Sequence, residues 1–291
     1  MTSKILVTGA SGGFGTRTVL SLLQRGHAVA ASMRDIAGKN ATAAAELRRR
    51  GATVVEMDVT DDASVDAGVE RAMQALGNID VVVNNAGVGV LGVQESFTPD
   101  DWKRLFDVNV FGVQRVNRAV LPHMRARGSG LLLQISSLLG RIAIPFYGPY
   151  NASKWAVEAM AENYRVELSG FGVDVAIVEP GGFPTTFIDA LMRPSDRSRD
   201  ATLQGLPEST QRFLHDFEQA LAANPAQDPQ LVADAVVQVI ETPAGQRKFR
   251  TVVDRMGMGA AIEPYNEHLE KIEEGVYGAF GIAHLRQLKT G

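Results

Sequence analysis

Three side chains in the middle of the chain have the types and spacing for proton transfer at a carbonyl. Tyr150 and Lys154 stand four residues apart in Tyr-Asn-Ala-Ser-Lys, and Ser137 precedes the tyrosine by thirteen residues. On a helix, a spacing of four places the phenol and the ammonium on one face, where the cation favours the ionised phenol. Chance alone gives a Tyr-x-x-x-Lys pair in roughly one such chain in eight, so the surrounding sequence must support the hypothesis.

A glycine-rich turn, Thr-Gly-Ala-Ser-Gly-Gly-Phe-Gly, follows the first apolar run of the chain. A glycine-rich sequence alone predicts no more than a turn. This one follows a strand-like run and opens a helix-like one, and there glycines let the backbone approach a pyrophosphate at the positive end of the helix. The spacing Gly-x-x-x-Gly-x-Gly differs from the common dinucleotide fingerprint. We expect the turn to bind the cofactor through Gly9, Ser11, Gly13, Phe14 and Gly15.

Short apolar runs alternate with longer amphipathic segments along the chain, a pattern typical of parallel strands joined by crossover helices. It predicts strands at 4–8, 27–32, 53–57, 79–84, 131–135, 173–178 and 249–253. It predicts helices at 14–25, 41–50, 62–76, 102–127, 151–170 and 229–241. The expected fold is α/β, a doubly wound parallel sheet of about seven strands in a single domain spanning 1–291. Ligands of such sheets bind beyond the carboxyl ends of the strands.

Composition argues against several classes of protein. The net charge is −4, and the basic residues form no stripe, so no nucleic-acid partner is expected. The chain has no Cys and five dispersed His, which argues against thiolate catalysis, disulfides and a metal centre. The first apolar run is too short for a signal peptide and no later run could span a bilayer. We therefore expect a cytoplasmic protein without a membrane span.

The end of the second predicted strand indicates which dinucleotide binds. An acidic residue there favours NAD, and a basic one accommodates the 2′-phosphate of NADP. The sequence places Met33 where the acid would stand and Arg34 directly after it. A guanidinium binds phosphate in a bidentate way, so we predict NADP(H), with Ser32 as a further contact. The competing interpretation is that Arg34 is a solvated loop residue and Asp35 binds the ribose.

From about residue 4 to 186, these motifs resemble the short-chain dehydrogenase/reductase family, whose members have a Rossmann-like fold. The variant glycine spacing is typical of that family, and Asn84-Asn85-Ala86-Gly87 matches its Asn-Asn-Ala-Gly motif. The resemblance implies cofactor contacts at Asp58, Val59, Asn85, Ala86, Gly87, Tyr150, Lys154, Pro180, Gly181 and Thr185.

The resemblance also implies a mechanism. Ser137 would hydrogen-bond the substrate oxygen, Tyr150 would give or take the proton, and Lys154 would lower the tyrosine pKa and hold the nicotinamide ribose. Asn109 matches the family's helix asparagine, whose main chain holds a water in the proton relay. The predicted activity is interconversion of a ketone or aldehyde and its alcohol, with hydride passing to or from NADP(H).

The segment from Phe187 to about Asp228 is too long for a simple connection and is interpreted as a substrate lid. Its apolar residues favour a neutral, hydrophobic substrate. A C-terminal extension, 256–291, is helix-like from Glu263 to Val276 and loosely resembles family members that act on retinoids and steroids. A dehydrogenase of a bulky lipophilic alcohol therefore remains a second interpretation.

Two further classes of protein share parts of this pattern. A noncatalytic NADP-binding regulator would have the same fold, but such proteins typically lose the tyrosine or the lysine, and this chain has both. A lyase or epimerase with a transient hydride step usually has a different glycine spacing. The predicted helices 102–127 and 151–170 resemble those of the family's dimer interface, so a homodimer or homotetramer is expected.

Overall fold

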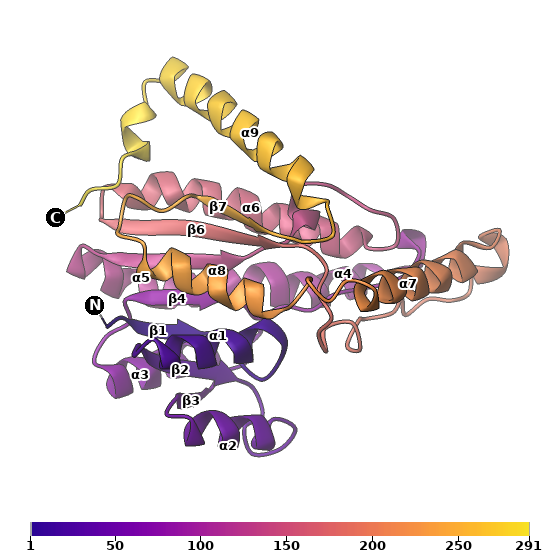
Figure 1. The fold of residues 1–291 in the computed structure, drawn as a ribbon, viewed down its shortest axis with the longest axis horizontal. Helices are drawn as coiled ribbons and strands as arrows, with labels where there is room; N and C mark the ends of the chain where they lie inside the picture. Colours follow the sequence, from indigo (N-terminus) through magenta and orange to yellow (C-terminus); the bar gives the residue numbers. More distant parts are fainter. Residues whose placement is uncertain (1, 291) are drawn as a thin grey trace.

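A single parallel sheet organises the computed structural model, which describes residues 2–290. Its strand order is β3-β2-β1-β4-β5-β6-β7 (Figure 1). The strands are β1 (Lys4–Val7), β2 (Ala28–Met33), β3 (Thr53–Glu56), β4 (Val81–Asn84), β5 (Gly130–Ile135), β6 (Val173–Pro180) and β7 (Arg250–Val253). Successive strands are added on one side of β1 up to β3 and on its other side from β4 onward, so the carboxyl ends of β1 and β4 flank the crevice where such sheets bind ligands. The predicted fold class is confirmed.

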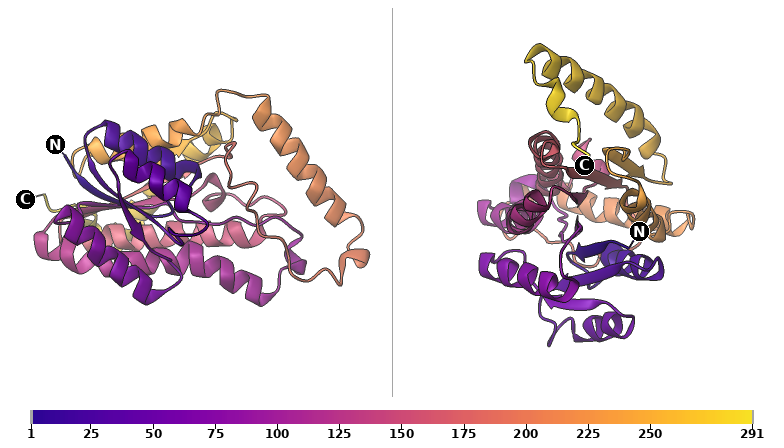
Figure 2. Two further views of the ribbon diagram at one scale, coloured as in Figure 1. Left: turned by 90° about the horizontal axis from the view of Figure 1, so that it is seen from below. Right: turned by 90° about the vertical axis from the view of Figure 1, so that its left-hand side faces the viewer.

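Helices cover both faces of this sheet, which is why its strands are almost continuously apolar. One face packs against α1 (Gly13–Gln24), α2 (Ala41–Arg49) and α8 (Gln230–Glu241). The other packs against α3 (Asp62–Leu76), α5 (Gly112–Arg127) and α6 (Gly148–Ser169). Figure 2 shows the two layers on opposite sides of the strands.

One long helix was predicted over 102–127, and the structure divides that region into three pieces. It contains α4 (Pro99–Phe106), a π-helical segment over Asp107–Phe111 and then α5. Thr98 caps α4 in a reciprocal bond with Asp101, which explains the earlier start. Likewise α6 begins at Gly148 rather than at 151, because Pro149 is well accommodated in a first helical turn.

Two helices extend away from this core (Figure 1). Helix α7 (Leu206–Ala222) lies in the predicted lid, beyond the carboxyl end of the sheet. Helix α9 (Gly259–Ala279) forms most of the C-terminal extension and is longer than the predicted 263–276. Within residues 2–290, no helix combines the length and apolar character needed to cross a membrane.

Candidate active site

The glycine turn lies against the loop after β4 with almost no space between the two backbones. Gly9 has φ +65°, and a Cβ there would lie 2.7 Å from the Ala86 Cα. A Cβ on Gly15 would collide with the Gly9 carbonyl oxygen. The Asn85 amide closes the contact by donating to the Thr8 and Gly9 carbonyls at 2.9 and 3.0 Å. The structure thus brings together two motifs predicted to bind one cofactor.

The N-terminus of α1 fits a pyrophosphate. Its N-cap is Gly12, with no side-chain cap and no acidic residue in the first turn, so the free N–H groups and the positive end of the helix dipole remain accessible to an anion. A hollow of about 340 Å³ opens beside it, lined among others by Gly13, Arg17 and Thr185. The sequence analysis did not select Arg17 as a cofactor contact. Its position one turn into the helix that follows the glycine turn could have indicated it.

The adenosine end of the site favours Arg34 over Asp35. The Arg34 side chain is 62% exposed and lies 4.0 Å from Asp58, so it has freedom to contact a ligand. The Asp35 carboxylate turns back into its own loop and accepts from the Lys39 N–H at 2.8 Å. Ser32 is not brought to this surface, because its hydroxyl is buried and donates to the Met57 sulfur at 3.6 Å. The predicted Ser32 contact therefore has no support, since a strand side chain in the sheet interior cannot reach the ribose.

Asn109 sits in the π-helical segment between α4 and α5. Its side chain is buried and forms a reciprocal pair with the Val88 backbone, accepting and donating at 2.9 Å. It also donates to Ser153 at 3.1 Å, on the same helix as Lys154. A π segment interrupts the regular helical hydrogen bonds and is frequent at functional sites. This geometry is compatible with the predicted water-holding role of the Asn109 main chain.

Ser137, Tyr150 and Lys154 converge at the carboxyl edge of the sheet. Ser137 follows β5, and its hydroxyl accepts from the Leu139 N–H at 3.1 Å, a capping role that leaves the hydroxyl proton free to donate. It lies close enough to the Tyr150 phenol to form a hydrogen bond that lowers the tyrosine pKa. The Lys154 ammonium donates to the Ile135 carbonyl at 2.8 Å and lies 5.6 Å from the centre of the Tyr150 ring.

Burial has the largest effect on the pKa values of Tyr150 and Lys154. It raises the pKa of Tyr150 above its usual value, against the smaller lowering effect of Ser137. Burial also lowers the pKa of Lys154 to about 8, and Glu158 opposes that shift. In this arrangement burial, Ser137 and Tyr147 shift the Tyr150 pKa, and the predicted effect of Lys154 stays a prediction. The ammonium is held by a backbone carbonyl over the ring, and desolvation of the phenol outweighs its hydrogen bond.

The remaining predicted contacts surround the same cleft. Pro180 ends β6, and the Gly181 N–H donates to the Val253 carbonyl at 2.9 Å. Thr185 faces the glycine turn across the hollow, with its Cβ 3.9 Å from a Cβ built on Gly13. At the adenine end, the Val59 side chain packs against Gly112. Gly87 lies between the asparagine and the lysine of the site, and a Cβ there would be 3.5 Å from Asn109 Oδ1 and 3.9 Å from Lys154 Nζ.

Aromatic and aliphatic side chains form the other wall of the cleft. The Tyr150 ring makes edge contacts with Phe187 at 5.8 Å and Tyr147 at 6.3 Å between ring centres. Phe213 of α7 continues the cluster, 6.1 Å from Tyr147 and 5.8 Å from Phe146. The lid is attached to the loop after β4 by backbone hydrogen bonds, including Leu91 N–H to the Met192 carbonyl at 2.9 Å. Apolar and aromatic side chains pack together in this cluster, so it suits an apolar molecule.

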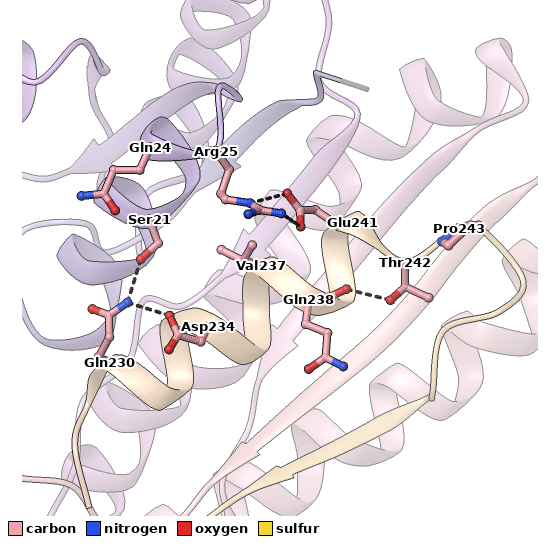
Figure 3. Close-up of a pocket in the computed structure, with 10 residues that line it drawn as sticks. All are labelled: Ser21, Gln24, Arg25, Gln230, Asp234, Val237, Gln238, Glu241, Thr242 and Pro243. Carbon is pink, nitrogen blue, oxygen red and sulfur yellow. Dashed lines mark hydrogen bonds and ion pairs between the residues drawn. The ribbon is translucent and has the colours of Figure 1, made fainter.

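A second hollow, of about 580 Å³, lies between α1 and α8 on the face of the sheet that these two helices cover (Figure 3). It contains none of the predicted site residues. Its polar groups are paired with one another, notably Arg25 with Glu241 at 2.7 Å and Gln230 with Ser21 at 2.8 Å. We interpret these contacts as structural ties between the two helices.

A glycine turn at a helix N-terminus, with a serine, tyrosine and lysine at the same sheet edge, defines a dinucleotide-binding oxidoreductase. A family model described as short chain dehydrogenase matches residues 3–195. The chain therefore belongs to the short-chain dehydrogenase/reductase family, and it is an oxidoreductase that acts on CH–OH groups.

Two curated relatives and one solved structure illustrate the similarity. Retinol dehydrogenase 8 of Bos taurus is 34% identical over 256 residues, covering 85% of this chain and 80% of the relative. Human 17-beta-hydroxysteroid dehydrogenase type 1 is 32% identical over 260 residues, covering 85% and 76%. A short chain dehydrogenase/reductase from Burkholderia phymatum, solved in complex with NAD, is 26% identical with a TM-score of 0.73 and covers 94% and 95%.

Proposed function

We propose that the protein is an NADP(H)-dependent oxidoreductase that interconverts a ketone or aldehyde and its alcohol, on a neutral hydrophobic substrate. One observation carries the proposal. Ser137, Tyr150 and Lys154 are buried together at the carboxyl edge of the sheet, where Tyr150 belongs to an apolar cluster and Lys154 Nζ lies 3.9 Å from the position of a Cβ on Gly87, in the loop after β4. This burial beside the loop after β4 supports a proton donor placed next to the segment that is expected to run along the cofactor.

In this mechanism the bound cofactor supplies or accepts a hydride, and the chain supplies position and protons. The free hydroxyl proton of Ser137 hydrogen-bonds the substrate oxygen. Tyr150 gives its proton to that oxygen during reduction. Its raised pKa makes the phenol a weaker acid, but the alkoxide that forms on the substrate is a stronger base than the phenolate, so the transfer is still favourable. Lys154 holds the ribose, and the lid side chains exclude water from the reacting atoms.

The preference for NADP rests on Arg34. Its guanidinium is exposed at the carboxyl end of β2, and the neighbouring carboxylate of Asp35 is committed to its own loop. Arg17 supplies a second cation beside the glycine turn. A dianionic 2′-phosphate would gain charge-assisted hydrogen bonds that a ribose hydroxyl cannot make. Among similar solved structures, two contain NAD or NADH and two contain NADP or 5-hydroxy-NADP, so the argument for NADP rests on these side chains.

A dehydrogenase of a bulky lipophilic alcohol is the second candidate. The size of the aromatic wall formed by Phe146, Tyr147, Phe187 and Phe213 favours it. The two curated relatives described above are named for retinol and for a hydroxysteroid, which supports the same candidate. Both candidates use the same residues and differ in the size of the substrate and in the direction of the reaction.

The deciding experiment measures oxidation of NADPH and NADH with an aromatic ketone, a steroid ketone and a sugar-derived ketone, and the reverse reaction with retinol. We expect faster turnover with NADPH and with an apolar substrate. Tyr150→Phe should lower kcat by at least about a thousandfold while NADPH still binds, because only the proton donor is lost. Tyr277→Phe, on α9 away from the cleft, is the matched control.

Three results would redirect the proposal. Binding of NADPH without turnover across the panel, unchanged by Tyr150→Phe, would identify a noncatalytic regulator. Product formation without net consumption of NADPH would indicate a lyase or epimerase. Equal or faster rates with NADH would overturn the Arg34 argument.

We also propose that the protein is cytoplasmic and forms a homodimer or homotetramer through α5 and α6. Light scattering after size exclusion would test the oligomeric state.

A further inference from the structure

Four charged side chains are buried together behind the catalytic residues, where α6, β6, β7 and α9 meet. Arg141, Glu158, Glu179 and Arg250 have side chains that are at most 5% exposed, and we call them the buried charge cluster. Arg250 lies 2.9 Å from Glu158 and 3.5 Å from Glu179. Arg141 lies 3.7 Å from Glu158 and 3.9 Å from Glu179. Charges this deeply buried are costly unless every partner is in place.

Three members of the buried charge cluster are neighbours in sequence of residues in the active site. Arg141 follows the short helical turn that Ser137 caps. Glu158 stands one turn after Lys154 on α6 and opposes the lowering of the lysine pKa. Glu179 directly precedes Pro180 in β6. A displacement within the cluster would therefore reach the catalytic serine and the nicotinamide segment through short pieces of chain.

Asn266 of α9 completes the cluster. Its side-chain oxygen accepts from Arg141 Nε at 2.9 Å, and its amide nitrogen donates to Glu179 Oε2 at 2.6 Å. The residue is 8% exposed and is one of three buried residues of α9, with Gly259 and Ile262. The rest of α9 stands off the sheet (Figure 1) and is tied down by exposed or half-buried ion pairs such as Arg165 with Glu270.

The cluster has little capacity to replace these two hydrogen bonds. Within residues 2–290, Arg141 Nη2, Glu158 Oε1 and Glu179 Oε1 already have no hydrogen-bond partner. Burial and the nearby Glu158 raise the pKa of Glu179 to about 8, against Arg250, Asn266 and Arg141, which lower it. Removing the Asn266 amide leaves Arg141 Nε and Glu179 Oε2 buried without these hydrogen bonds. Buried unpaired polar groups are costly, so we expect the two side chains to move to new partners.

We propose that Asn266 is a positioning residue for the active site: from the C-terminal helix it fixes Arg141 and Glu179, and through them the segments that carry Ser137 and Pro180-Gly181. The inference rests on the proposed function for its catalytic consequence, but not for the contact itself. The C-terminal extension, which carries none of the predicted site residues, then becomes part of the catalytic unit.

Hydrogen exchange tests the contact in the full chain and needs no substrate. In Asn266→Ala, amides of 136–147 and 180–186 should exchange about tenfold faster, because both segments lose their anchor. Ile262→Ala is the matched control, since it removes a buried side chain from the same helix without touching the cluster. It should speed exchange in the first turn of α9 and leave 136–147 unchanged, because both Asn266 hydrogen bonds remain. Unaltered exchange at 136–147 in Asn266→Ala, or equal loosening in both variants, would overturn the proposal.

Steady-state kinetics test the expected effect of Asn266 on catalysis. Asn266→Ala should lower kcat about tenfold with an unchanged KM for NADPH, because a small misplacement of the serine mainly affects the reacting geometry. A fall in kcat shared equally by Ile262→Ala, or a rise in KM alone, would contradict the positioning role. If the wild type turns over no substrate, the proposed function fails, and the exchange result still decides whether Asn266 anchors the two segments.

Asn266→Asp separates the two hydrogen bonds. Its carboxylate still accepts from Arg141, but it can bond Glu179 only when the two carboxyls share a proton. The groups around that proton are Arg141 at the end of the Ser137 turn, Glu158 and Glu162 on α6, Arg250 on β7 and Glu273 on α9. We expect near-wild-type protection of 136–147 at pH 6 and its loss at pH 9. Loss at both pH values would overturn the role of Glu179.

Discussion

The two walls of the cleft are built by different means, although both lie at the carboxyl edge of the same sheet. The cofactor wall is main chain packed against main chain: Gly9 and Gly15 leave no room for a Cβ beside Ala86 and the turn itself. The substrate wall is side chain packed against side chain, from Tyr147 to Phe213 of the lid. The first has little freedom to vary, whereas the second can exchange one apolar group for another.

This difference shows why the family resemblance identifies chemistry better than substrate. Close backbone approaches require particular residue types, so they leave a motif in the sequence. Apolar packing tolerates substitutions that conserve volume, so it leaves no more than a hydrophobic pattern. The cofactor wall therefore predicts a reaction class, and the substrate wall predicts no more than the polarity and size of the ligand.

The strongest test of this contrast is Gly9→Ala. The new Cβ would meet the Ala86 backbone at 2.7 Å in a residue with φ +65°, so we expect NADPH affinity to fall about a hundredfold through displacement of the turn. Fluorescence titration of NADPH measures it. Gly26→Ala is the control, because Gly26 has φ +80° but no atom within 4 Å of its Cβ position. Equal loss of affinity in both variants would mean that strain, and not the backbone contact, matters.

An intermediate effect is expected at the edge of the cofactor wall. Arg34→Ala should weaken NADPH about tenfold and leave NADH affinity unchanged, because a charge-assisted hydrogen bond to the 2′-phosphate is lost. Parallel titrations with the two cofactors measure the ratio. Arg48→Ala removes the same charge from an exposed site on α2 and should change neither affinity. If NADH weakens as much as NADPH, Arg34 does not recognise the phosphate.

The smallest effect belongs to the substrate wall. Phe213→Ala should raise KM for an apolar ketone about fivefold and leave NADPH affinity unchanged, since part of a shared aromatic surface is lost and its neighbours remain. Steady-state kinetics with saturating NADPH measures this change. Phe171→Ala, 49% exposed in the turn after α6, is the control. A large fall in kcat would indicate that the lid positions reacting groups as well as binding substrate.

The elements that carry the cofactor motifs were predictable because hydrophobic period and glycine position are local properties. The seven strands lie close to their predicted ranges, and the glycine turn opens α1 as expected. The π-helical segment at Asn109 was not predictable, because a local pattern cannot distinguish it from regular helix. The burial of the Ser32 side chain was not predictable for a related reason: which face of a strand lies in the interior depends on the neighbouring strand and helix.

The buried charge cluster lay furthest from prediction. Asn266 is separated by 125 residues from Arg141 and by 87 from Glu179, and a lone asparagine in an amphipathic helix is typical of a surface position. The direction of the Tyr150 pKa was likewise hidden, because it depends on how much water the fold removes from the phenol.

The sequence by itself determined the α/β fold and, through its family resemblance, the class of reaction, and it predicted Ser137, Tyr150 and Lys154 as the catalytic residues. These follow from residue types at short range, where backbone geometry allows few other arrangements. Tertiary structure alone decided that burial raises the tyrosine pKa, that Phe187 packs against Tyr150 and Phe213 against Tyr147, and that the C-terminal helix contacts Arg141 and Glu179 through Asn266. Desolvation and long-range packing depend on which distant segments come together, and no local pattern specifies that.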